Sequence, residues 1–117
     1  LRFDPETAEF STYELPTLSP DEYETPYALN VDRATGDVWL TSNMSDRILR
    51  FIPGEERFIS YPSPTRVTWL RDLVFTRDGK VCSSSSNLPA YAIEDGVPSI
   101  ICLDPEGGSK DRVLAGR

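Results

Sequence analysis

Residues 1–17 read LRFDPETAEFSTYELPT, and residues 49–65 read LRFIPGEERFISYPSPT. The two stretches are offset by 48 positions and share eight identical residues within a window of 17. Two unrelated windows of this length would share roughly one residue at ordinary amino-acid usage. The match at a fixed offset indicates an internal repeat, so the two stretches are expected to occupy equivalent places in the fold.

The period of the repeat predicts the architecture. A period of about 40 to 50 residues built from short alternating strands is typical of a β-propeller, in which each repeat forms one blade. No stretch of the sequence has the pattern of a helix. The sequence therefore predicts an all-β fold, namely a β-propeller fragment made of four-stranded antiparallel blades.

Alternating apolar and polar residues, separated by turn residues, place the strands within each unit. Residues 26–64 are expected to form a complete blade, with strands at 28–32, 37–42, 48–52 and 57–61. Residues 70–117 are expected to form a second blade with a long insertion at about 85–99, and with strands at 72–76, 80–84, 100–104 and 112–115. Leu29, Val31, Gly36, Val38 and Phe51 of the first unit correspond to Leu73, Phe75, Gly79, Val81 and Leu103 of the second.

Residues 1–18 match only the last two strands of a unit and are expected to form the second half of a blade, its two outer strands. The chain holds about 2.4 periods, whereas propellers close with typically 4 to 8 blades. We therefore expect a piece of a longer protein, from its carboxy-terminal part, with two strands missing upstream. Missing blades of the same protein, or self-association, are expected to cover the open blade edges, which would otherwise promote aggregation.

The charge balance excludes some partners. The chain has 12 Lys and Arg, 19 Asp and Glu, and no His, for a formal net charge of −7. Nucleic-acid binding depends on clustered basic residues, so no DNA or RNA partner is expected. No apolar run approaches the roughly 20 residues that cross a bilayer, so we expect no membrane partner and a soluble chain, either cytoplasmic or exported.

Cys82 and Cys102 are the only cysteines, which is too few for a structural zinc site. On the expected strands Cys82 lies opposite Leu103 and Cys102 lies opposite Ser83, so the two sulfurs would point to opposite faces of the sheet. This arrangement favours two buried free thiols over a disulfide. Trp39, the counterpart of Cys82 in the first unit, is expected to pack between neighbouring blades.

Two pairs of residues have the pattern of turns rather than of ligand sites. Asp4 and Asp104 each precede a proline, which favours a turn over a cation ligand because the carboxylate bonds the backbone two residues on. Gly36 and Gly79 are expected in tight turns, because neither opens a helix that could hold a phosphate. No metal site is predicted.

Ligands of a propeller are expected at the end of the central channel, at residues that flank the innermost strand of each blade and follow its second strand. The candidate ligand-binding residues there are Tyr27, Asn43, Asp46, Trp69, Arg71, Asp72 and Asn87, with Asn30 beside them. Arg71 could orient a carboxylate through a bidentate contact, or it could form an exposed ion pair with Asp72. No catalytic residue is assigned, because the chain lacks histidine, the usual general base, and its run of serines lacks a nucleophile elbow.

Residues 36–41, GDVWLT, followed by DRILR at 46–50 and by Phe58, Tyr61 and Pro62, resemble the repeat phrase of the streptogramin (virginiamycin B) lyase-like propellers. Residues 26–29, PYAL, resemble the phrase that opens each repeat of that family. The resemblance covers residues 26–64 well, residues 1–16 in part and the last unit weakly. It implies a seven-bladed propeller in the complete protein and, in true members, magnesium-dependent opening of a cyclic depsipeptide by elimination.

That reaction uses a histidine base and glutamates that hold the metal. This chain has no histidine, and Ser42 stands where a glutamate often follows the tryptophan phrase, so no catalytic or metal-binding residue is transferred. Magnesium is implied only for the complete protein.

The leading hypothesis is therefore a fragment of a lyase-like propeller that binds a small or peptidic ligand at the channel mouth, with catalytic residues outside this piece. The phrase is also shared loosely with NHL-type and sugar-lactonase-like propellers, so the alternative is a non-catalytic NHL-type propeller that serves as a protein-interaction module. A third reading is a complete 117-residue protein, either a sandwich or an oligomeric propeller.

Overall fold

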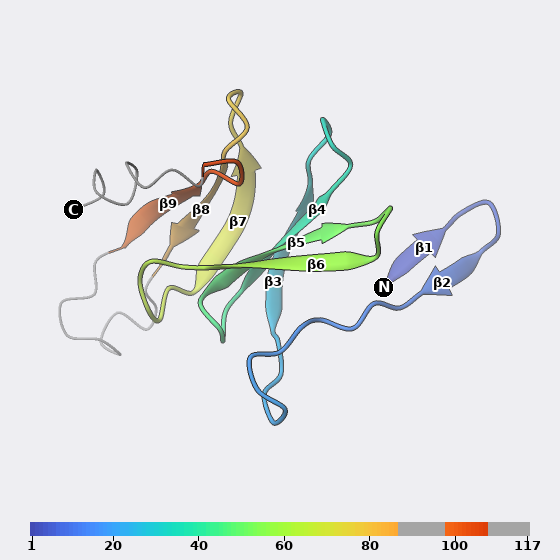
Figure 1. Ribbon diagram of the computed structural model, residues 1–117, viewed down its shortest axis with the longest axis horizontal. Coiled ribbons are helices and arrows are strands. Elements are labelled where there is room, and N and C mark those ends of the chain that lie inside the picture. Colours follow the sequence, from blue (N-terminus) through green and yellow to red (C-terminus); the bar gives the residue numbers. More distant parts are fainter. Residues whose placement is uncertain (87–97, 108–117) are drawn as a thin grey trace.

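The computed structural model describes residues 1–86 and 98–107, and these form three antiparallel sheets with no helix among them (Figure 1). The first sheet pairs β1 (Arg2–Asp4) with β2 (Glu9–Ser11). The second has the order β3 (Pro26–Val31), β4 (Val38–Ser42), β5 (Arg47–Ile52), β6 (Arg57–Pro62). The third has the order β7 (Leu70–Phe75), β8 (Val81–Ser85), β9 (Ser99–Leu103).

The second sheet is a four-stranded antiparallel meander, as a propeller blade requires, and it contains all four strands expected in residues 26–64. The third sheet repeats the first three of these strands in the same order. The strand expected at 112–115 and most of the expected insertion lie outside the described residues. The prediction of an all-β fold with propeller-like blades is confirmed.

Turn chemistry explains where the strands reverse. The β3–β4 and β7–β8 turns place Gly36 at φ +80° and Gly79 at φ +83°, a left-handed conformation that glycine adopts without steric cost. Asp4 Oδ1 accepts a hydrogen bond from the backbone N–H two residues on at 2.9 Å, and Asp104 Oδ1 does the same at 3.0 Å. The predicted roles of these four residues in turns are confirmed.

The main core lies between the second and third sheets. Trp39 and Ile48 of the second sheet pack against Leu70, Leu73 and Val81 of the third, and all five are buried. Burying such side chains supplies most of the driving force that holds two sheets together. Trp39 therefore packs between neighbouring sheets, as expected.

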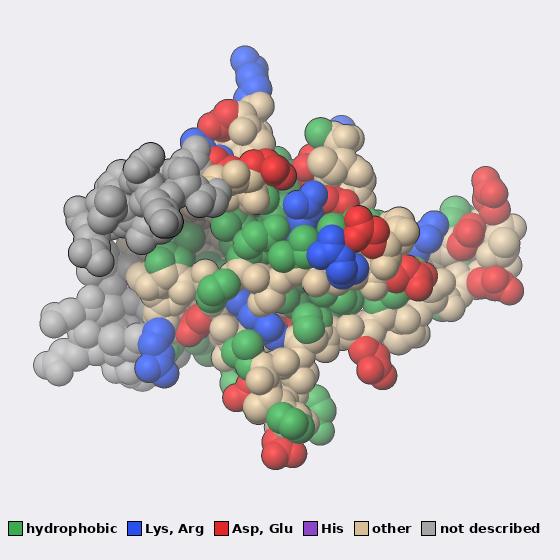
Figure 2. Space-filling view, in the orientation of Figure 1, with side chains coloured by type: hydrophobic (Ala, Val, Ile, Leu, Met, Phe, Trp, Pro, Cys, Tyr) green, Lys and Arg blue, Asp and Glu red, His purple; other side chains and the backbone are tan. Residues whose placement is uncertain are grey.

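The opposite face of the second sheet is only partly covered. Tyr13 and the segment around it pack on Leu40, Leu49 and Phe51, with the Tyr13 and Phe51 ring centroids 4.6 Å apart. On this face Leu29 of β3 remains 58% exposed, whereas Leu73, its counterpart in β7, is 0% exposed. In Figure 2 hydrophobic side chains are exposed between scattered acidic and basic ones.

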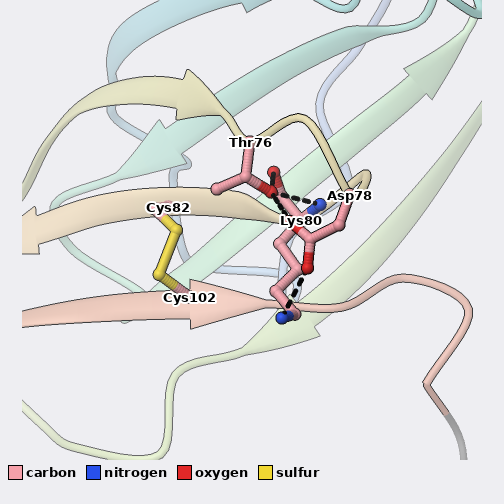
Figure 3. The surroundings of a disulfide bond; sticks show 5 residues. All are labelled: Thr76, Asp78, Lys80, Cys82 and Cys102. Atoms are coloured by element: carbon pink, nitrogen blue, oxygen red, sulfur yellow. Dashed lines mark hydrogen bonds and ion pairs between the residues drawn. A yellow bond between two sulfur atoms is a disulfide. The ribbon is translucent and has the colours of Figure 1, made fainter.

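Cys82 and Cys102 form a disulfide, with their Cα atoms 4.1 Å apart (Figure 3). The prediction of two free thiols is wrong because its register was wrong by one residue. Cys82 lies directly opposite Cys102, and Val81 lies opposite Leu103. Directly opposed residues of antiparallel strands point to the same face, so the two sulfurs meet.

None of the described segments forms a helix that could cross a bilayer.

Candidate functional site

The candidate site lies at the end of the sheets where β3 and β7 begin. These two strands are each the first of their sheet, and they pack against each other. The connections that precede β3 and β7 and the one that follows β4 lie at this same end (Figure 1). Six of the expected ligand-binding residues belong to these connections or to the strand ends beside them: Tyr27, Asn43, Asp46, Trp69, Arg71 and Asp72. Asn87 lies outside the described residues.

Tyr27 of β3 and Arg71 of β7 are in direct contact across the two sheets. The guanidinium carbon of Arg71 lies 4.9 Å from the centroid of the Tyr27 ring, which is within the range of a cation–π interaction. Arg71 Nε–H also donates to Ser86 Oγ at 3.3 Å, and the Ser86 hydroxyl donates to the carbonyl of Trp69 at 2.9 Å. Segments from both sheets therefore position the Arg71 side chain.

The side chains of Asp72 and Asn30 form hydrogen bonds with backbone groups. Asp72 Oδ1 accepts a hydrogen bond from Leu73 N–H at 2.8 Å, and no ion pair joins Asp72 to Arg71 within the described residues. Asn30 Nδ2 donates to the Leu73 carbonyl at 2.8 Å, and Asn30 Oδ1 accepts from Val31 N–H. Asn30 thus links β3 to β7, the same two strands that the contact between Tyr27 and Arg71 joins.

Asp46 anchors the connection between β6 and β7. Its carboxylate accepts hydrogen bonds from Val67 N–H and Thr68 N–H, both at 2.7 Å, and from the Thr68 hydroxyl at 2.8 Å. Asp46, Val67 and Trp69 have φ of 50°, 51° and 46°, an uncommon conformation for residues with a side chain. The carboxylate of Asp46 therefore stabilises a tightly bent segment that leads directly to Arg71.

Asn43 provides a polar atom that lacks a partner. Its Oδ1 is buried and accepts no hydrogen bond within the described part of the chain. Buried side-chain acceptors are usually paired, because an unpaired one costs about 1–3 kcal/mol. Asn43 stays a candidate for binding a donor group.

A buried ion pair that the sequence analysis missed fixes the connection before β3. Glu24 pairs with Arg47, and their side chains are 1% and 4% exposed. The Glu24 carboxylate also accepts hydrogen bonds from the hydroxyls of Ser42 and Ser45. Glu24 lies in an irregular segment without periodicity, and Arg47 lies just before the strand expected at 48–52, so no sequence pattern indicated that the two side chains are buried.

A hollow of about 760 Å³ lies on the exposed face of the second sheet and is the alternative candidate for binding. Its lining is largely apolar and includes Leu15, Leu29, Val31, Leu40 and Phe58. Tyr27 belongs to this lining as well as to the contact with Arg71. The hollow and the Arg71 contact are therefore adjacent.

Comparison with known proteins gives two similar solved structures. One is selenomethionine-substituted virginiamycin B lyase from Staphylococcus aureus, with 24% sequence identity, a TM-score of 0.50, and coverage of 68% of this chain and 28% of the lyase chain. The other is a catalytically inactive variant of the same lyase with quinupristin, with 20% identity, a TM-score of 0.52, and coverage of 74% and 30%. The chain has the fold of part of the β-propeller in these lyase structures.

The resemblance inferred from the repeat phrase is thus confirmed at the level of the fold. The chain spans less than a third of the length of those lyase chains. No protein-family model matches the chain, and no curated protein matches it.

The carboxylates of the described residues do not form a magnesium site. Among the described residues, no three Cys, Asp or Glu side chains come together in an arrangement that could hold a metal. Glu24 is paired with Arg47, Asp37 is paired with Arg50, and Asp46 is bonded to the β6–β7 connection. These residues stabilise the fold, and no chemical step through a metal is assigned to them.

Proposed function

We propose that this chain is the carboxy-terminal part of a lyase-like β-propeller whose intact disc binds a small or peptidic ligand at the channel mouth. The observation that carries the proposal is the contact of Tyr27 with Arg71. It brings an aromatic ring and a cation from two neighbouring blades together at the end where the connections between blades meet. Loops presented by a rigid scaffold are where binding residues concentrate.

The similar lyase structure that contains quinupristin supports a ligand of this size as the first probe. Tyr27 is 56% exposed, so its ring is available to an apolar ligand group. We assign the catalytic groups to blades outside this chain. The chain has no histidine, and Glu24 and Asp46 at this end are held in an ion pair and in hydrogen bonds within the protein.

Nuclear magnetic resonance titration of the 117-residue chain with quinupristin tests the proposal. We expect shifts concentrated at Tyr27, Trp69 and Arg71, and a loss of most of these shifts in the Tyr27→Ala variant. Tyr23→Ala is the matched control, because Tyr23 is 87% exposed and makes no contact with Arg71. Absence of shifts at this end, or equal effects of the two variants, would reject the site.

The hollow on the exposed face of the second sheet supports a second proposal, that a further protein surface covers this face. Leu29 and Val31 are 58% and 42% exposed there, which is unusual for large apolar residues in adjacent positions of one sheet face. We propose that missing blades of the same protein, or a second copy, cover this face when the disc is complete. A single stoichiometric protein partner in a pull-down, without metal-dependent turnover, would favour the interaction module instead.

A further inference from the structure

Three arginine side chains of the described residues are not exposed, and two of them face a carboxylate. Arg47 pairs with Glu24, and Arg50 pairs with Asp37 at 2.5 Å. The third is Arg71, and no carboxylate of the described residues pairs with it. Partly buried guanidinium groups are normally paired, because desolvation of an unpaired charge is costly.

Among the described residues, the groups that hold Arg71 in position include no carboxylate. The Tyr27 ring contacts its guanidinium from β3, the Ser86 hydroxyl accepts from its Nε–H, and the Ser83 hydroxyl donates to its backbone carbonyl at 3.1 Å. The only side-chain hydrogen bond of Arg71 to another described residue is the one from Nε–H, so no described residue accepts from Nη1 or Nη2. A guanidinium held in this way loses little side-chain entropy when it binds a ligand.

The nearest carboxylate in the sequence does not fill this role. Asp72 bonds the backbone N–H of Leu73, and its side chain forms no pair with Arg71. Asp46 is likewise occupied by Val67 and Thr68.

We propose that Arg71 binds a carboxylate of the ligand, so that the site takes a peptide or small molecule with a free carboxyl group. This inference rests on the proposed ligand site and assigns its chemical class. The two Nη groups donate side by side to the two carboxylate oxygens, a geometry that guanidinium matches and ammonium does not. The exposed part of the Tyr27 ring contacts the apolar group next to that carboxylate.

The test compares N-acetyl-alanyl-phenylalanine, which has a free carboxylate, with its carboxyl amide. Both are titrated into the full 117-residue chain, and the Arg71 Nε–H resonance and the amide resonances of residues 27 and 69–72 are followed. We expect the acid to shift these resonances and to bind roughly tenfold more tightly than the amide. Acetate alone is expected to shift the Arg71 resonance at higher concentration.

Two substitutions separate charge from geometry. Arg71→Gln is expected to abolish the preference for the acid over the amide. Arg71→Lys keeps the charge and perturbs the fold less, and it is expected to reduce this preference roughly fivefold. Arg33→Gln is the matched control, because Arg33 is exposed in the turn between β3 and β4, at the opposite end of the sheet from the site. Equal binding of the acid and the amide at Tyr27 would reject the role of Arg71 in binding a carboxylate but would retain the ligand site. No binding of either compound would reject both the carboxylate role and the ligand site.

One further variant tests for a partner within the chain. Glu94 and Asp95 are acidic residues of the segment outside the described residues. The double variant Glu94→Gln and Asp95→Asn is expected to bind the acid as the unmodified chain does. A clear gain in affinity would show that Arg71 is already paired and would overturn the proposal.

Discussion

Cys82 and Cys102 occupy, in β8 and β9, the same opposed positions that Trp39 and Arg50 occupy in β4 and β5. In the second sheet the guanidinium of Arg50 lies over the Trp39 ring at 5.4 Å. In the third sheet a covalent bond replaces that contact. Two neighbouring blades thus fix the same cross-strand pair by different chemistry.

Removing the disulfide is expected to destabilise the chain. The bridge closes a loop with a sequence separation of 20, for which the chain-entropy estimate is about 3 kcal/mol. We expect the variant with Cys82→Ser and Cys102→Ser to lose about this much free energy of unfolding, measured by urea titration. The unmodified chain in reducing agent should behave in the same way. A mass without the loss of two hydrogens under non-reducing conditions would contradict the bridge.

Breaking the buried ion pair is expected to have a larger effect. Glu24→Gln leaves the Arg47 guanidinium buried without its counter-ion, which costs about 3–5 kcal/mol in comparable sites. Urea unfolding measures the loss, and Glu22→Gln, on an exposed residue of the same connection, should change stability by less than about 0.5 kcal/mol. Replacing both partners, with Glu24→Leu and Arg47→Met, should recover much of the loss. If the double variant recovers no stability, the ion pair contributes more to the free energy of unfolding than the neutralisation of two buried charges.

Asp46→Ala is expected to loosen the connection between β6 and β7. Three donors lose their acceptor, and the loss of hydrogen bonds to a charged group should cost about 3 kcal/mol. Hydrogen exchange is expected to speed up at the amides of Val67 and Thr68 before it does so in the strands. Asp72→Ala is the control, because its carboxylate accepts one hydrogen bond from the adjacent residue. Unchanged exchange at residues 67 and 68 would contradict the anchoring role.

Asp78 is expected to titrate at unusually low pH. Hydrogen bonds from Lys80 and then from Thr76 lower the pKa of its carboxyl group from 3.8 to about 2 (Figure 3). Because the pKa is lower in the folded state, the stabilisation is present above pH 3.8 and is lost as the pH falls through 2. A carboxyl carbon titration measures this value, and Lys80→Ala should move the pKa back toward 3.8. The same pKa in both proteins would exclude Lys80 as the cause.

The sequence predicts the strands well because local signals specify them. Gly36 and Gly79 mark turns that need positive φ, and alternation places Trp39 on the face that meets the next sheet. The pairing of β8 with β9 was harder, because a long connection gives no hairpin turn to set the register. The correct register follows from the correspondence of Phe51 with Leu103. Phe51 pairs with Val38 in the second sheet, and Leu103 pairs with Val81, the counterpart of Val38, in the third.

The strand ends on which the candidate residues lie could be predicted from the sequence, but the contacts between these residues could not. The sequence places Tyr27 and Arg71 at the starts of equivalent strands, yet their contact depends on how two sheets pack, which no local pattern encodes. The bonding of Asp46 to Val67 and Thr68 is equally non-local. The burial of Glu24 could not be predicted, because an irregular connection has no periodicity that would indicate a buried position.

Asn30 and Leu73 are joined by a side-chain amide, although β3 and β7 belong to separate sheets. The seam between the two sheets is therefore bonded through a side chain and not through the backbone ladder of either sheet. A substitution at position 30 that removes the amide would take this donor from the Leu73 carbonyl and weaken the seam without disturbing the strand pairing within each sheet.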